Sequence, residues 1–171
     1  MLGTLLGCRT VEHNLYKDIE MPLFEGALKI GVSATPKDYD VNNKRLTKYA
    51  EPYSLDFRFY TNKSEILSGL RVTDISLEGK KTGIVISLSP REKKYSGSKR
   101  AYESESIKSI FVMVGYEEET QKWSYEPYTL RAKIEVYRNG TYFDEQNIEV
   151  LLEPNPKKSK RSDAFDSFMS R

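Results

Sequence analysis

The chain has 171 residues, of which 38% are hydrophobic and 12% aromatic, a composition that favours one folded domain with tails over a disordered chain. The 27 basic and 25 acidic residues leave a formal net charge of +2. Because no strong overall field draws the molecule to nucleic acid, we expect no nucleic-acid partner. No run approaches the roughly 18 apolar residues of a transmembrane helix.

Apolar and polar residues alternate in a series of short segments, which is typical of strands with one buried face. Val72 is out of phase with its neighbours, and a bulge at 70–73 would explain it. Asn139 and Gly140 predict a tight hairpin turn, because both residues readily take positive φ values. The predicted strands cover 27–33, 53–60, 73–77, 84–88, 110–114, 130–136 and 148–152.

Seven or eight short strands with almost no helical periodicity indicate an all-β fold. The predicted architecture is an antiparallel β-sandwich of immunoglobulin-like type, with a barrel as the competing closure. Short helical turns are expected in the loops, at 42–50, 62–68 and 163–169. Pro154 and Pro156 are expected to end the last strand.

The residue types that catalysis usually needs are scarce. His13 is the only histidine, and it lies in a segment interpreted as a tether, which cannot hold a catalytic base in place. One cysteine and one histidine cannot complete a closed zinc site. The segment 79–82, Gly-Lys-Lys-Thr, lacks the earlier glycine of a phosphate-binding loop and is predicted to be a turn. We therefore expect no catalytic residue, metal or cofactor.

Two segments are candidate binding surfaces. A polar connection after Leu88 is longer than an ordinary hairpin turn and can meet phosphates or anionic glycans, or be a solvated loop. Aromatic residues around Pro127 can form a platform for a sugar or a protein, although core or edge packing is the favoured interpretation. The candidates are Arg91, Lys93, Lys94, Tyr95, Lys99 and Arg100 in the connection, and Trp123, Tyr125 and Tyr128 in the aromatic group.

The segment Leu5-Leu6-Gly7-Cys8 resembles the lipobox of bacterial lipoproteins, with apolar residues before it and polar residues after it. The resemblance implies cleavage before Cys8, lipidation of Cys8 and export to the cell envelope. Arg9 follows the cysteine, which in this class favours the periplasmic face of the outer membrane. The apolar run is shorter than the roughly 7 to 15 residues of a full signal, as a truncated signal would be. The alternative is a frayed N-terminus with an incidental cysteine.

These observations predict a lipid-anchored, non-catalytic binding module of the cell envelope, with an envelope protein or a glycan as its partner. One alternative is a glycan or cell-wall binding module with weak hydrolase activity. Another is an intracellular β-sandwich adaptor whose basic tail meets acidic partners. The predicted parts are a signal-peptide remnant at 1–7, the lipidated cysteine and tether at 8–25, the β-sandwich at 26–153 and a basic C-terminal tail at 154–171.

Overall fold

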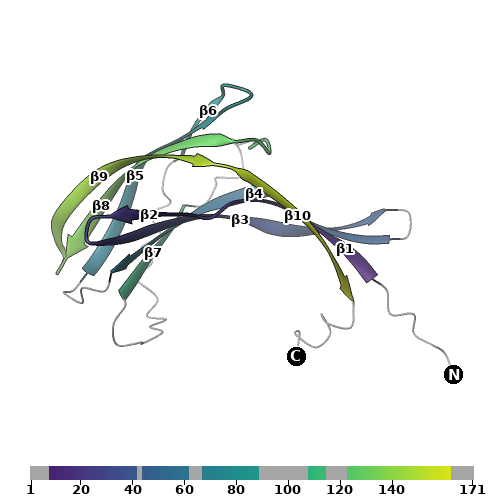
Figure 1. Ribbon diagram of the computed structural model, residues 1–171, viewed down its shortest axis with the longest axis horizontal. Helices are drawn as coiled ribbons and strands as arrows, with labels where there is room; N and C mark the ends of the chain where they lie inside the picture. The colour runs from purple at the N-terminus through teal and green to yellow at the C-terminus, as the bar shows by residue number, and fades with distance from the viewer. Residues whose placement is uncertain (1–7, 42–43, 62–66, 89–107, 115–122, 163–171) are drawn as a thin grey trace.

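The computed structural model describes residues 8–41, 44–61, 67–88, 108–114 and 123–162, which form strands and turns without a helix (Figure 1). The prediction of an all-β chain is confirmed, and the immunoglobulin-like sandwich stays a prediction. The strands form two sheets, which we call sheet A and sheet B.

Sheet A has the strand order β10-β1-β4-β3-β2, and β7 also pairs with β4. All its pairings are antiparallel except β1 with β4, which run parallel. Its strands are β1 (Cys8–Tyr16), β2 (Ile19–Leu23), β3 (Gly26–Val41), β4 (Lys44–Thr61), β7 (Lys108–Val114) and β10 (Pro154–Ser162).

Sheet B is antiparallel, with the strand order β6-β5-β8-β9. The β8–β9 hairpin turns at Asn139 and Gly140, whose φ angles of 51° and 75° are those that a tight hairpin turn needs. The turn predicted from the sequence is therefore confirmed. The strands are β5 (Leu67–Gly79), β6 (Val85–Leu88), β8 (Tyr128–Arg138) and β9 (Thr141–Leu152).

One core joins the two sheets. Alternate residues of β8 are buried, as are alternate residues of β4 and β3 in the facing sheet. Full burial of an aliphatic or aromatic side chain contributes about 1.5–3 kcal/mol relative to its exposure, so this shared core holds the sheets together. Its members include Leu28, Ile30, Leu55, Phe57 and Phe59 of sheet A and Leu77, Leu130, Ile134 and Leu152 of sheet B.

The phase break in β5 comes from a bulge that lies slightly later than predicted. The pairing of β5 with β8 shifts register between Thr73 and Ser76, and Asp74 takes a left-handed φ of 51°. Because the bulge reverses the alternation, Val72 and Ile75 are both buried.

Several predictions about the ends of the chain are wrong. Residues 8–16 and 19–23 form β1 and β2, where the sequence predicted a tether, and residues 154–162 form β10, where it predicted a tail. Residues 44–50 belong to β4, where a helical turn was expected. The strand tolerates Pro154 and Pro156 because β10 pairs with β1 alone within the described structure, and an edge strand needs amide donors on one side only.

The two end segments and the paired parts of β3 and β4 form a projection that we call the arm, made of residues 8–15, 35–41, 44–50 and 155–162. It contains most of β1, the second half of β3, the first half of β4 and most of β10. Figure 1 shows it extending past the region that sheet B covers. The rest of the two sheets is the body of the molecule, and a shift of pairing between Ala34 and Thr35 marks the boundary on β3.

Candidate binding surfaces

The aromatic candidates lie in the core. Trp123 and Tyr128 are each 1% exposed, so neither can offer a flat platform to a sugar or a protein. Tyr125 is partly buried, and its hydroxyl donates a hydrogen bond to the Leu15 carbonyl at 2.8 Å. All three residues therefore take part in core packing, the interpretation that the sequence favoured. Trp123 and Tyr128 are overturned as candidate ligand-binding residues.

These rings join the base of the arm to the body. Tyr16 of β1 packs against Trp123 at a centroid distance of 6.0 Å and edge-on against Tyr53 at 5.8 Å. The Tyr16 hydroxyl donates to the Glu126 carbonyl at 3.0 Å, and burial raises the pKa of this phenol. The arm therefore leaves the body from a fixed point, because Tyr16 is packed on its ring and bonded at its tip.

Glu126 organises the turn between β5 and β6. Its carboxylate is 3% exposed and accepts hydrogen bonds from the backbone N–H groups of Lys81 at 2.6 Å and Thr82 at 3.1 Å. The hydroxyls of Thr82 and Ser124 donate to it as well, each at 2.7 Å. A Cβ on Gly79 would lie 2.8 Å from a Glu126 oxygen, so any other residue there would displace the carboxylate. The turn predicted at 79–82 is confirmed, and its amides already bind a carboxylate of this chain.

Two carboxyl groups of the body have pKa values shifted in opposite directions. Burial alone would raise the pKa of Glu126, but the four donated hydrogen bonds outweigh it and lower the pKa to about 2. For Asp56 on β4, burial prevails and raises the pKa, although a hydrogen bond from Ser33 opposes it. Asp56 Oδ1 is buried without a hydrogen-bond partner among the described residues. Ionised Glu126 therefore stabilises the fold, and ionised Asp56 does not.

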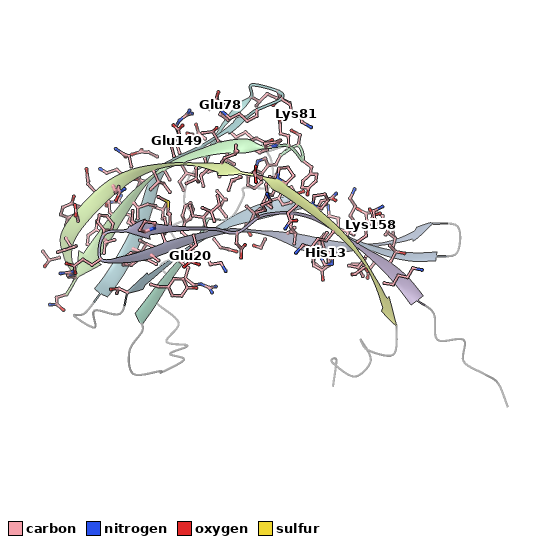
Figure 2. All side chains as sticks on the ribbon, in the orientation of Figure 1. His13, Glu20, Glu78, Lys81, Glu149 and Lys158 are labelled. Carbon is pink, nitrogen blue, oxygen red and sulfur yellow. The ribbon has the colours of Figure 1, made fainter. Side chains whose placement is uncertain are left out.

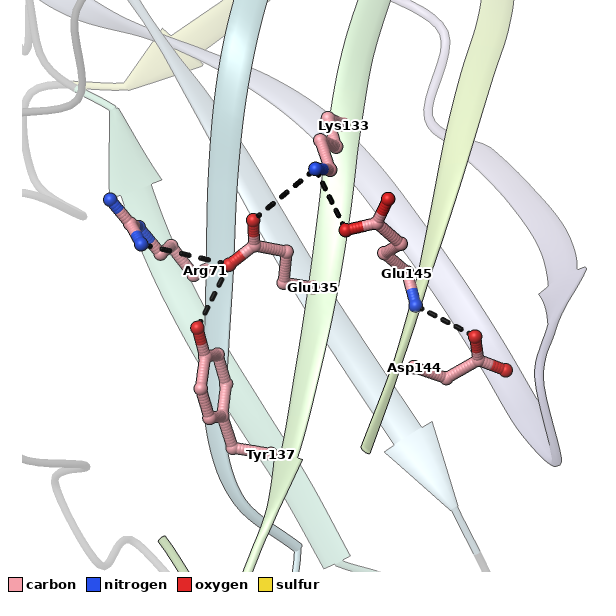
Figure 3. Close-up of polar contacts among 6 residues, drawn as sticks. All are labelled: Arg71, Lys133, Glu135, Tyr137, Asp144 and Glu145. Atoms are coloured by element: carbon pink, nitrogen blue, oxygen red, sulfur yellow. Dashed lines mark hydrogen bonds and ion pairs between the residues drawn. The ribbon is translucent and has the colours of Figure 1, made fainter. Parts of the chain in front are cut away.

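The outward face of sheet B is an ion-pair network. Arg131 of β8 contacts Glu78 of β5 and Glu149 of β9, both at 2.8 Å. Further along the strands, Lys133 contacts Glu145 of β9 at 2.7 Å and Glu135 at 3.7 Å (Figure 3).

Arg71 of β5 also lies 3.7 Å from Glu135, and the Tyr137 hydroxyl donates to the same carboxylate at 2.8 Å. Figure 3 shows these groups meeting across three adjacent strands. Each of these basic side chains is therefore paired with a carboxylate within the sheet.

The arm carries a different kind of surface, which we call the lysine face. Strand register aligns Lys158, Glu12, Lys48 and Lys37 in one row across β10, β1, β4 and β3. The next row on the same face, two residues along each strand, holds Lys160, Thr10, Leu46 and Tyr39.

One carboxylate on this face, that of Glu12, interacts with two lysines. Glu12 contacts Lys158 at 2.7 Å, and hydrogen bonding to Lys158, with a smaller effect of Lys48, lowers the pKa of Glu12. Lys37, Lys48 and Lys160 form no ion pair with any described residue. Tyr39 is 45% exposed beside them. Figure 2 labels Lys158 on the arm, well apart from Glu78 and Glu149 on sheet B.

The opposite face of the arm holds a hollow of about 510 Å³ near the body. His13 borders it and stacks on Tyr49, with ring centroids 4.7 Å apart and planes at 12°. His13 is therefore a packed residue of β1, where the sequence predicted an exposed bystander on a tether. The hollow is lined by His13, Leu15, Tyr16, Lys17, Asp18, Asn155 and Lys157.

Exposed apolar side chains lie at the two sheet B hairpins, which turn at opposite ends of the sheet. Tyr142 and Phe143 of β9 are 50% and 39% exposed, and the Arg138 guanidinium lies 3.5 Å from the centre of the Phe143 ring. Ile84 and Val85, at the start of β6, are 57% and 62% exposed. The sequence predicted Ile84 on the buried face, but it sits at the turn, beyond the reach of the core.

The remaining candidates are placed as follows. Cys8 begins β1, where its backbone pairs with Ser162. The basic connection with Arg91, Lys93, Lys94, Tyr95, Lys99 and Arg100 lies outside the described residues, as does the segment 1–7.

Within the described ranges, no group of three or more potential metal ligands comes together. The same residues contain no helix of the length and apolarity needed to cross a membrane. Comparison with protein-family models, with curated proteins and with solved structures gives no match. The functional argument therefore rests on the surfaces of this chain.

Proposed function

We propose that the protein is a lipid-anchored lipoprotein of the bacterial cell envelope, attached through Cys8, whose β body is a non-catalytic binding module. The observation that carries the proposal is the place of Cys8 at the first residue of β1, at the outer end of the arm. The lipobox-like sequence before it supplies the chemistry of attachment.

The arm suits this role because it connects Cys8 to the body through paired strands. Tyr16 is fixed in the core, and eight residue steps of about 3.3 Å separate it from Cys8, which places the attachment point roughly 26 Å away. A flexible tether of the same length would let the body approach the membrane in any orientation. A strand paired on both sides limits that freedom.

The binding module in this proposal is a two-layer β-sandwich that meets an envelope protein at the exposed start of β9. Support comes from the shared core of the two sheets and from exposed Tyr142 and Phe143, since exposed aromatic residues are common at protein interfaces. A glycan platform at Trp123 loses its support because the indole is buried.

Metabolic labelling in the native host, with the protein expressed from its own gene, tests the anchor. A clickable palmitate analogue should label the protein, and the label should be lost in Cys8→Ser while the protein is still made. The sequence has one cysteine, so this substitution is free of interference from other thiols. An unlabelled protein that retains a free thiol at Cys8 would remove the proposal.

A further inference from the structure

We propose that the lysine face of the arm binds the anionic headgroups of a phospholipid bilayer, with the arm lying along the membrane. This deepens the proposed function, since it gives the anchored protein a second membrane contact and an orientation. It concerns the side chains of β10, β1, β4 and β3, and it does not require Cys8 to be lipidated.

The positive charge on this face exceeds its negative charge. Four lysines and one glutamate make up the ionisable groups of its two rows, and Glu12 is already in contact with Lys158. Lys37 and Lys160 are exposed and Lys48 is partly exposed, so their ammonium groups can reach an external anion. The ion pairs across sheet B demonstrate that this chain places carboxylates beside its cations elsewhere.

The shape of the face fits a bilayer. Adjacent strands lie about 4.8 Å apart, so a row across four strands spans roughly 14 Å, and the two rows are separated by roughly 7 Å along the strands. Such a broad array can reach several headgroups at once. No cleft is needed, because an anionic membrane presents charge over its whole surface.

The uncharged members of the second row distinguish a membrane from other polyanions. Tyr39 is 45% exposed and Leu46 is partly exposed beside Lys160. A tyrosine ring with basic neighbours is a typical arrangement at the level of lipid headgroups, where the ring meets the acyl boundary and the charges meet phosphate. The phosphate backbone of a nucleic acid has no apolar layer that Leu46 could contact.

Cys8 lies at the same end of the arm. Its backbone is two residues from Thr10 of the second row, or roughly 7 Å along the strand. This is within the Debye length of about 8 Å at physiological ionic strength. An acyl anchor at Cys8 would therefore hold the second row, which contains Lys160, inside the attractive field of the membrane. Stable attachment commonly uses a lipid with a basic patch.

Vesicle binding by the full chain with Cys8→Ser tests the inference without any contribution from an acyl group. The chain should sediment with vesicles of phosphatidylcholine and phosphatidylglycerol, should not sediment with phosphatidylcholine alone, and should be released by high salt. Equal binding to both vesicle types would overturn the inference. Tighter binding to RNA or heparin than to the anionic vesicles would overturn it too, in favour of a general polyanion site.

The variant Lys37→Gln/Lys160→Gln tests whether the lysine face is responsible for vesicle binding. Each lysine near an anionic surface contributes about fivefold to the partition coefficient, so the double variant should bind about 30-fold more weakly. The matched control is Lys80→Gln/Lys81→Gln in the exposed turn of sheet B, which changes the charge equally and should leave binding unchanged. An equal loss in both double variants would overturn the inference.

A charge-conserving variant guards against loss of folding. Lys37→Arg/Lys160→Arg should retain binding, and its loss there would overturn the inference. Because every variant is built on Cys8→Ser, vesicle binding can succeed where palmitate labelling fails, and the reverse. The two proposals can therefore fail separately.

Discussion

The body and the arm differ in how their charged side chains are paired. On the outward face of sheet B, Arg131 lies between Glu78 and Glu149, and Lys133 lies between Glu135 and Glu145. On the arm, Lys37 and Lys160 have no ion-pair partner among the described residues, and Lys48 interacts only with Glu12, which is already in contact with Lys158. The formal net charge of +2 averages over these regions and hides the contrast. Paired charge suits a surface left in water, whereas unpaired charge of one sign suits an external partner of the opposite sign.

The two regions should also differ in stability, and the largest effect is expected in the core of the body. Trp123→Ala should lower the free energy of unfolding by about 3–5 kcal/mol, because it leaves a large cavity among Tyr16, Tyr53 and Tyr128. Urea denaturation measures this loss. Val11→Ala in the arm should cost clearly less than Val72→Ala in the body, since Val11 lies outside the shared core, and equal costs would show that the arm and body share one core.

The next effect concerns Glu126 and the pH dependence of stability. Its pKa in the folded protein is about 2 against an ordinary value of 4.5, so its contribution is present above about pH 4.5 and is lost as pH falls toward 2. Glu126→Gln should lower the urea midpoint at pH 7 and reduce this acid-side fall. Urea unfolding curves at several pH values measure the midpoint and its dependence on pH. If the variant loses stability at acid pH as the parent does, another carboxyl group causes that loss.

Asp56 should act with the opposite sign. Burial raises its pKa in the folded state, so its ionisation opposes folding, and protonation on the acid side relieves that cost. Asp56→Asn should therefore raise the urea midpoint at pH 7, with little change near pH 3. Asp144→Asn, at an exposed aspartate of β9, is a control for the loss of a carboxylate. A lowered midpoint for Asp56→Asn would indicate that the carboxylate has a stabilising partner.

A smaller effect is expected at the junction of the two regions. Tyr16→Phe removes the hydrogen bond to the Glu126 carbonyl while keeping the ring, at a cost of about 1 kcal/mol. Amide hydrogen exchange should show faster opening of β1 and β10 in this variant, with β8 unaffected. Equal acceleration in β8 would mean that the arm unfolds only together with the body.

The strands of the body could be predicted well because burial of one face requires apolar residues at alternate positions of the sequence. In β8 the apolar residues Leu130, Ile134 and Val136 alternate with charged ones, since one side faces the core and the other faces water. The turn at Asn139 and Gly140 could also be predicted, because its positive φ values restrict the residue types that fit.

The arm could not be predicted in the same way. Residues 157–161 are Lys-Lys-Ser-Lys-Arg, which contain no apolar alternation, yet they form a regular ladder with β1. Hydrogen-bond pairing leaves no trace in hydrophobic periodicity when both faces of a strand are largely exposed. The parallel pairing of β1 with β4 was missed because the paired residues 10–13, Thr-Val-Glu-His, show no regular apolar alternation.

The Glu126 site was missed because its donors are distant in sequence. Lys81 and Thr82 lie about 45 residues before it, and their contribution is made mostly by backbone amides, which every residue possesses. Trp123 was ambiguous for another reason, since a large aromatic residue serves a core and a binding surface equally well. Only the packing against Tyr16 and Tyr53 decides between them.

The pairing of β1 has a mechanical consequence. All nine of its residues pair with β10 on one side, and residues 10–13 also pair with β4 on the other. A force applied to Cys8 along the strand axis and resisted by the body would load these hydrogen bonds in shear, so that many must break together. A force that drew Cys8 sideways from Ser162 would break them one after another. The arm should therefore withstand traction along its length far better than peeling at its tip.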